Sequence, residues 1–340
     1  MLCCAHRAIR LAELWRDDAP GERRAALVEN GQIVEIYIQR DLHWTLGATG
    51  TGRIERKAPS GSYVATDEGT EILIRGKANA AEGARVTFEI TREAIAEPGR
   101  IKPAEGRVLE AMPEASRDKD GMWDDRLSAL KQNTIRNQAF DDAFDAAIAG
   151  ASHIGDVTVS FQRTKAGLVF DIDGIGDPLV INRMAANEVA RLLRLYQIGA
   201  MVMIDFVAID SKARRIEIAE TFDAAAASDL RPFERSAVNG YGLMQVVRAR
   251  PRPSVLDHLF GTRIASLSDE TQALSLLREA ATSSGFGPRI ITARPEITTL
   301  LASHKWQSFT QLCERQVGAR LEIIADESAS GYGHVHVAQS

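Results

Sequence analysis

The chain has 340 residues, of which 45% are hydrophobic and 26% are charged, so it is long enough for two or three domains with substantial cores. Its net charge of −5 argues against a protein that is basic over its whole surface, although a local basic cleft is compatible with it. The sequence contains no run of eighteen apolar residues, which predicts that the chain has no membrane span.

The start of the chain and its cysteines favour a cytoplasmic location. MLCCAHRAIR, residues 1–10, is too short and too charged to hold the apolar core of a secretory signal. The three cysteines, Cys3, Cys4 and Cys313, provide no framework for disulfides. We therefore expect a protein of the reducing cytoplasm.

The first third of the chain predicts β-structure. Residues 23–40, RRAALVENGQIVEIYIQR, fit two strands joined by a tight turn at Asn30 and Gly31, because these residue types accept positive φ angles. Short β-rich runs broken by glycine follow and predict a small barrel. The expected divisions are a hairpin of the core at 1–35, the barrel at 36–97, a linker rich in proline, glycine and charge at 98–121, the core at 122–265 and a small α/β appendage at 266–340.

The second half of the chain predicts a mixed α/β core. GLVFDID, from residue 167, is a strand, residues 184–199 form an amphipathic helix that ends at Gly199, and AMVMIDFVAID at residues 200–210 is a buried strand. This order indicates a βαβ-like unit. A further strand, GLMQVVR, starts at residue 242 and runs into a basic, proline-rich segment.

Acidic residues end two of these apolar strands. Asp171 and Asp173 are two residues apart and so project from the same face of a strand, and Asp205 ends the other strand. If the strands are neighbours, Asp171 and Asp205 approach each other, and such carboxylates repel unless a cation or a proton lies between them. Oxygen ligands at a half-open site suit Mg²⁺, which can activate water at a phosphate. The alternative is that the acids only end strands and are solvated.

A second enzyme class competes for the same residues. FDIDG matches most of the Asp-x-Asp-Gly-Thr motif of haloacid-dehalogenase-type phosphatases, in which the first acid is the nucleophile. Ile175 stands where that motif has threonine, and the motif follows 170 residues of other sequence instead of opening the domain. We regard this reading as the weaker one.

Two groups of basic residues are candidates for binding RNA. In RARPRPS, three arginines alternate and would line one face of an extended segment, where they fit a phosphate backbone: Arg248, Arg250 and Arg252. A solvated edge strand is the alternative for this group. The second group lies in the expected barrel, where basic grooves and aromatic side chains bind single strands: Arg53, Arg56, Lys57 and Tyr63. Tyr63 can equally be a core residue.

The chain resembles the ribonuclease E/G family of RNA endonucleases. The resemblance is carried, in the family's order, by RAALVENGQIVEIYI, RTKAGLVFDIDG, ANEVARLLRLYQIGAMVMIDF and GYGLMQVVRARPRPS. It implies an α+β, mixed α/β chain with an RNase H-like and DNase I-like core, an inserted OB-type barrel, and the capacity to form homo-oligomers. It also implies Asp171 and Asp205 as ligands of Mg²⁺, with Mn²⁺ as a substitute, and cleavage of single-stranded RNA to a 5′-phosphate and a 3′-hydroxyl.

The sequence departs from the family at several points. Asp173 stands where the family usually has an asparagine that orients the site. The segment that senses the 5′ end is not recognisable between residues 98 and 155, so we expect little preference for 5′-monophosphorylated RNA. The paired cysteines of the zinc link are missing, so we expect no zinc. Ala65 stands where the barrel of the family has a phenylalanine.

We therefore predict a cytoplasmic, Mg²⁺-dependent endoribonuclease, with Asp171, Asp173 and Asp205 in the catalytic site. The main alternative is a non-catalytic RNA-binding protein that has kept the same scaffold.

Overall fold

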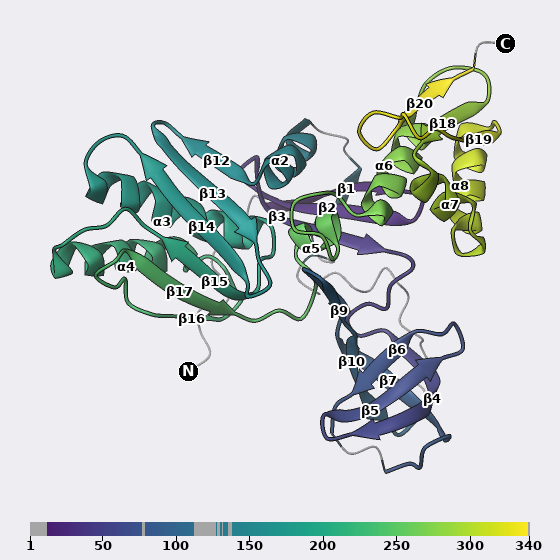
Figure 1. Cartoon of the computed structure of the whole chain (residues 1–340), viewed down its shortest axis with the longest axis horizontal. Helices are drawn as coiled ribbons and strands as arrows, with labels where there is room; N and C mark the ends of the chain where they lie inside the picture. The colour runs from purple at the N-terminus through teal and green to yellow at the C-terminus, as the bar shows by residue number, and fades with distance from the viewer. Residues whose placement is uncertain are drawn as a thin grey trace.

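The computed structural model describes residues 12–76, 79–111, 127, 130, 132–134 and 138–338. In Figure 1 a six-stranded sheet lies on the left, the N-terminal sheet lies at the centre, a closed barrel hangs below, and a small C-terminal unit lies at the upper right. The predictions of a mixed α/β chain and of a small β-barrel are confirmed.

The N-terminal sheet has the strand order β11-β1-β2-β3. Its strands are β1 (Ala12–Ala19), β2 (Glu22–Glu29), β3 (Gln32–Arg40) and β11 (Gln132–Thr134). Asn30 and Gly31, with φ angles of 52° and 77°, form the turn between β2 and β3. The predicted hairpin is therefore confirmed. Strand β1 pairs with β2 on one side and, in parallel, with β11 on the other.

The barrel closes in the order β10-β6-β5-β4-β7. Its strands are β4 (Thr49–Ala58), β5 (Gly61–Thr66), β6 (Glu71–Ile74), β7 (Arg85–Arg92) and β10 (Ala104–Leu109). Strands β6 and β10 pair in parallel, and the other neighbouring strands are antiparallel. This arrangement is consistent with an OB-type barrel. Every second side chain of β5 is buried, as a strand with one face on a core requires.

The barrel boundaries differ from those expected. The barrel runs from Thr49 to Leu109 and not over 36–97, because β3 continues to Arg40 in the N-terminal sheet. The linker expected at 98–121 is wrong in its first part, which forms β9 (Arg100–Lys102), paired with β8 (Ile95–Glu97), and the closing strand β10. Residues 112–121 of that linker lie outside the described residues.

The six-stranded sheet has the order β12-β13-β14-β15-β17-β16. Its strands are β12 (Ala151–Ile154), β13 (Val157–Arg163), β14 (Leu168–Gly174), β15 (Ala200–Asp205), β16 (Phe233–Arg235) and β17 (Leu243–Arg248). Its helices are α2 (Gln138–Ala149), α3 (Pro178–Leu195) and α4 (Lys212–Ala226). Figure 1 shows α3 and α4 together along one face of this sheet, where their apolar side chains share its core.

Two local features bring β14 and β15 together. The α3 helix begins at Pro178 because Asp177 caps its first turn by accepting a hydrogen bond from the Leu179 N–H, 2.8 Å away. At the start of β14, Gly167 has a φ angle of 155°, and a Cβ there would lie 2.2 Å from the Met201 carbonyl oxygen. Only glycine therefore permits the close approach of the two strands at this end.

The C-terminal unit packs a three-stranded sheet, ordered β19-β18-β20, against helices. Its elements and the short helix before it are α5 (Val255–Phe260), α6 (Asp269–Thr282), β18 (Arg289–Ala293), α7 (Pro295–Ala302), the 3₁₀ helix η2 (His304–Trp306), α8 (Gln307–Val317), β19 (Leu321–Ala325) and β20 (His334–Val337). Arg278 of α6 reaches the N-terminal sheet and pairs with Asp17 at 2.6 Å and with the buried Glu22 at 3.4 Å. Buried ion pairs thus join the C-terminal unit to the N-terminal sheet.

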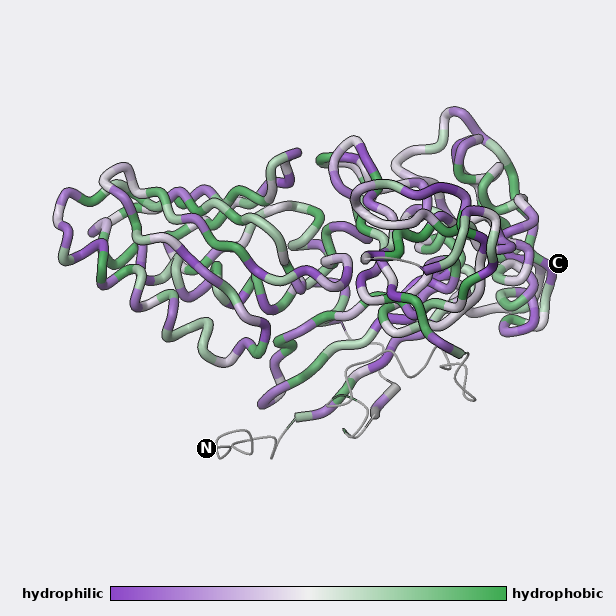
Figure 2. The backbone as a smooth tube through the Cα atoms, turned by 90° about the horizontal axis from the view of Figure 1, so that it is seen from below, coloured by the Kyte–Doolittle hydropathy of each residue, from purple (hydrophilic) through white to green (hydrophobic). Residues whose placement is uncertain are grey.

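Hydrophobic and hydrophilic stretches alternate along the chain, as the tube in Figure 2 shows. Within the described residues, no helix combines the length and the apolar character that crossing a bilayer requires.

Candidate active site

Asp171 and Asp205 lie directly opposite each other in the six-stranded sheet. They end the paired stretch of β14 and β15, which run in parallel with the register Asp171 to Asp205. The backbones of neighbouring strands are about 4.8 Å apart. Both carboxylates are exposed, while Phe170 and Ile204 beside them are buried against the helices. The two acids therefore share the open face of the sheet, as the sequence predicted.

The electrostatics of Asp205 reflect this proximity. Partial desolvation by the surrounding protein raises the pKa of Asp205, and the negative charge of Asp171 raises it further. A carboxylate whose pKa is raised by its neighbour gains stability when a cation binds between the two groups.

A cavity of about 670 Å³ lies beside the two carboxylates. It extends from Asp171 and Asp205 across Ser160 and Gln162 of β13 towards the end of α2 and the start of α5. Its other walls are largely apolar, with Ile148 and Phe260 among the lining residues. The acids thus border a hollow large enough for part of a ligand, and are not isolated on a convex surface.

Asp173 lies two residues further along the same face of β14, opposite Thr158 of β13, and is exposed. It is therefore beside Asp171 and beyond the last paired residue of β15. The structure brings together all three acids that the sequence predicted for the site.

Asn182 of α3 holds the segment that follows Asp205. Its side chain is fully buried, donates a hydrogen bond to the Val207 carbonyl oxygen at 2.7 Å and accepts one from the Val207 N–H at 3.0 Å. This pairing fixes the direction in which the chain leaves β15. Asn182 is not among the site residues predicted from the sequence, where its only signal is a polar residue on the apolar side of an amphipathic helix.

Replacing Asn182 by alanine is expected to destabilise the fold by about 1–3 kcal/mol, because both backbone groups of Val207 lose their partner. Urea unfolding measures this change. The control is Asn187→Ala on the exposed side of α3, where the amide only contacts the Arg183 carbonyl oxygen. The control should change stability by no more than about 0.5 kcal/mol. Equal effects of the two substitutions would contradict this role for Asn182.

Tyr241 is 84% exposed and lies two residues before Leu243, which pairs with Asp205. It lies in the turn before β17, and the Asn239 side chain accepts hydrogen bonds from the N–H groups of Tyr241 and Leu243, at 2.8 and 3.0 Å. The next residue, Gly242, has a φ angle of 91°, and a Cβ there would lie 2.3 Å from the Phe206 carbonyl oxygen. The turn therefore holds an exposed aromatic ring next to the end of β15.

The three alternating arginines at and after the end of β17 do not form an exposed row. Arg248 is 3% exposed, forms an ion pair with Asp229 and donates to the Ile198 carbonyl oxygen, so the prediction that it contacts RNA is wrong. Its partners come from elsewhere in the fold, and alternation in the sequence could not reveal them. Arg250 pairs with Glu97 at 3.0 Å and with Asp257 at 2.7 Å, and so joins the β8–β9 hairpin to α5.

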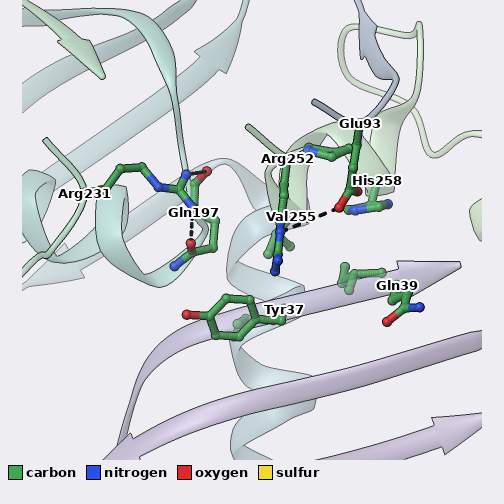
Figure 3. Close-up of a pocket in the computed structure, with 11 residues that line it drawn as sticks. Tyr37, Gln39, Glu93, Gln197, Arg231, Arg252, Val255 and His258 are labelled. Atoms are coloured by element: carbon green, nitrogen blue, oxygen red, sulfur yellow. Dashed lines mark hydrogen bonds and ion pairs between the residues drawn. The ribbon is translucent and has the colours of Figure 1, made fainter. Parts of the chain in front are cut away.

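Arg252 also points into the structure. Figure 3 shows it beside Glu93, 3.6 Å away, in a small pocket between β3 and the segment that leads into α5. The pocket has a volume of about 20 Å³, which is room for roughly one water molecule. Its residues therefore serve the packing of the barrel against the core more than the binding of a substrate.

The basic residues predicted in the barrel are exposed on its surface. The Arg56 guanidinium stacks on the Tyr63 ring, 3.4 Å from its centroid, and pairs with Glu71 at 3.1 Å. Tyr63 is thus half-buried beneath an arginine and is not a core residue. Arg53 donates to the Gly83 carbonyl oxygen, and Lys57 is exposed next to Arg56.

The donor atoms at the site suit a hard cation. Among the residues that the structure describes, no group of three or more histidine, cysteine, aspartate or glutamate side chains is arranged to hold a metal. Two carboxylates on an open face fit Mg²⁺, which keeps several waters and takes one or two carboxylates plus phosphate oxygens. They do not form the closed set of four ligands that structural zinc needs.

Residues 177–251 match the Ribonuclease E/G family. This segment is similar to the Ribonuclease E/G family. It spans α3 to β17 and contains Asp205, Asn182 and Tyr241, and Asp171 precedes it on the paired strand. The resemblance drawn from the sequence is thus confirmed.

Individual Ribonuclease E relatives match more of the chain. Ribonuclease E of Escherichia coli (strain K12) is 27% identical over 167 residues, which is 46% of this chain and 16% of that protein. Ribonuclease E of Haemophilus influenzae is 32% identical over 115 residues, covering 32% of this chain and 12% of the relative. The chloroplastic Ribonuclease E/G-like protein of Arabidopsis thaliana is 32% identical over 77 residues, covering 23% of this chain and 8% of the relative. The chain thus corresponds to a small part of each relative.

Proposed function

We propose that this protein is a Mg²⁺-dependent endoribonuclease that cleaves single-stranded RNA and leaves a 5′-phosphate and a 3′-hydroxyl. Mn²⁺ is expected to replace Mg²⁺. In this proposal the six-stranded sheet is the catalytic core, with RNase H-like and DNase I-like parts, and the protein acts in the cytoplasm and can form homo-oligomers. The observation that carries the proposal is the pairing of Asp171 with Asp205 beside a large cavity, next to a segment that matches the Ribonuclease E/G family.

Asp171 and Asp205 would hold the metal ion, and Asp173 would orient the groups around it. When bound, Mg²⁺ would supply an activated water and neutralise charge that develops on the phosphate. The cavity beside the acids would take the nucleotide next to the scissile phosphate. Tyr241 offers an exposed ring next to the end of β15, and stacking of a base on such a ring is worth about 1–3 kcal/mol.

RNA outside the active site would be bound through exposed positive charge. In the barrel, Arg53, Arg56 and Lys57 are accessible, and the Arg56–Tyr63 pair presents a flat cationic surface. Arg250 and Arg252 would act mainly by joining the barrel to the core, through Glu97 and Glu93.

The second candidate is a non-catalytic RNA-binding protein on the same scaffold. It is favoured by the finding that, in the described part of the chain, no three acidic, histidine or cysteine side chains are arranged to hold a metal ion together. The paired, exposed carboxylates favour the enzyme, because a protein that only binds RNA gains nothing from two like charges facing the phosphates. The Ribonuclease E/G match also favours a nuclease over a haloacid-dehalogenase-type phosphatase.

Incubation of the purified protein with end-labelled single-stranded RNA tests the proposal. We expect fragments with Mg²⁺ and none with a chelator, and the downstream fragments should be ligatable through a 5′-phosphate. RNA that is bound but stays intact in Mg²⁺ would favour the non-catalytic candidate. Release of phosphate from a small ester, without RNA cleavage, would favour the phosphatase.

A further inference from the structure

A second hollow lies at the opposite end of β14 and β15 from the carboxylates. It has a volume of about 180 Å³ and forms where the β8–β9 hairpin meets the turn between β13 and β14. We call it the basic cleft, and its charged lining residues are Glu97, Arg100, Lys102, Arg163, Lys165, Arg250 and Asp257. Five of these are cations and two are carboxylates, so the cleft has a net charge of +3 in a chain of net charge −5.

The inner charges of the basic cleft are matched by one another. Asp257 is buried and accepts from Arg250 at 2.7 Å and from Arg163 at 3.2 Å. Arg163 also donates to the carbonyl oxygens of Ala96, Gly261 and Arg263, so its hydrogen-bonding capacity is used inside the protein. These residues form the floor of the cleft.

The cations at the rim of the basic cleft outnumber the carboxylates that contact them. Glu97 is contacted by Lys102 at 2.6 Å, Arg100 at 2.7 Å and Arg250 at 3.0 Å, so three cations share one carboxylate. Lys165 is exposed and has no acidic partner among the described residues. The rim of the basic cleft therefore presents surplus positive charge to solvent.

The rim is also held in place. Lys165 lies over the β8–β9 turn, since its Cε is 3.8 Å from the position that a Cβ on Gly99 would take. The turn that carries Lys165 is closed by Thr164, whose hydroxyl accepts from the Ala166 and Gly167 N–H groups at 3.2 Å each. A turn that is ordered before a ligand arrives costs less to fix when the ligand binds.

The basic cleft adjoins the cavity at the carboxylates. Arg163 and Leu256 line both hollows, so these two residues form a wall that the hollows share. Lys165 lies in the turn before β14, and along that strand Leu168 and Asp171 are about 10 Å apart, at roughly 3.3 Å per residue. A chain molecule with regularly spaced anions that enters one hollow can therefore reach the other along the open face.

We propose that the basic cleft binds a phosphate group of the RNA chain, and that Lys165 and Arg100 are its main contacts. The site would hold the RNA away from the point of cleavage, so that the strand lies along the open face of the sheet. This inference rests on the proposed function for the identity of the ligand. The phosphate is either an internal phosphodiester or a 5′-terminal monophosphate, and both carry the chemistry that the cleft recognises.

The test is RNA affinity, measured by fluorescence anisotropy with a chelator present, so that the readout does not depend on cleavage. Lys165→Glu should weaken binding about tenfold, and Lys165→Ala should lower the salt dependence by about the 0.7 expected for one phosphate contact on a single strand. The matched control is Lys305→Glu, an exposed lysine of the C-terminal unit, which should leave the affinity unchanged.

Oligonucleotides with a 5′-hydroxyl or a 5′-monophosphate separate the two sources. Weaker binding of both to the Lys165→Glu variant supports an internal phosphate, and weaker binding of the 5′-monophosphate alone supports a terminal one. If Lys165→Glu and Lys305→Glu have equal affinities for both oligonucleotides, the site is rejected. A protein that binds RNA through the cleft but never cleaves it would contradict the proposed function and leave this inference standing.

Discussion

Asp171→Asn is expected to lower the rate of RNA cleavage by on the order of 10³-fold, with RNA affinity largely unchanged. The carboxylate lies on the open face opposite Asp205, and the amide keeps its shape but removes the charge that would hold a cation. Loss of a metal's charge stabilisation is worth several kcal/mol in the transition state, and each 1.36 kcal/mol is tenfold in rate. Single-turnover cleavage and anisotropy measure the two quantities separately.

Asp173→Asn is the matched control for this experiment. It makes the same chemical change two residues along the same face of β14. An amide at this position can orient the groups around the metal ion as the carboxylate would, so we expect this variant to keep its cleavage activity. Equal rates for Asp171→Asn and the unmodified protein would exclude Asp171 as a metal ligand, and equal loss in both variants would point to a general effect of charge.

Glu22→Gln is expected to destabilise the protein by about 3–5 kcal/mol, the range for breaking a buried ion pair from one side. Glu22 is 1% exposed and contacts Arg24 at 2.7 Å, Arg40 at 2.9 Å and Arg278 at 3.4 Å. The variant leaves three guanidinium groups without their shared carboxylate. Guanidinium chloride unfolding, followed by circular dichroism, measures the loss.

The control is Glu217→Gln, which makes the same change in an exposed pair with Arg183 at 3.4 Å. Exposed pairs contribute at most about 1 kcal/mol, so the control should stay close to the unmodified protein. Similar losses in the two variants would contradict the assignment of stability to the buried cluster.

The Glu22 cluster also predicts how stability depends on pH. Burial raises the pKa of Glu22, but the charges of Arg24, Arg40 and Arg278 and a hydrogen bond from Arg40 outweigh it and hold the pKa well below its usual range. The stabilisation is therefore complete above the unfolded pKa, about 4.3, and is lost as the pH falls towards the folded value. Glu22→Gln should show a shallower decline in stability below about pH 4.

The carboxylate pair could be predicted from the sequence because its signal is local. An apolar strand that ends in Asp171, and a second one that ends in Asp205 after an amphipathic helix, place both acids at one edge of a sheet by strand periodicity alone. The turn at Asn30 and Gly31 was equally local, since both residues have positive φ angles there.

The errors arose where partners lie far apart in the sequence. The alternation of Arg248, Arg250 and Arg252 resembles an exposed face, but Asp229, Glu97 and Glu93 neutralise them from other parts of the fold. The composition of the last barrel strand, β10, predicts a linker instead of a strand. Its Gly106 is needed where the barrel closes, since a Cβ there would lie 2.8 Å from the Glu89 carbonyl oxygen.

The parallel register of β14 and β15 makes the connection between α3 and β15 intolerant of changes in length. Side chains alternate between the two faces of a strand, so inserting or deleting a single residue ahead of Ala200 would shift β15 by one step. Asp205 would then turn towards the helices, and Ile204 would come to solvent in its place. Natural homologues and engineered variants should therefore vary in residue type at this connection but keep its residue count.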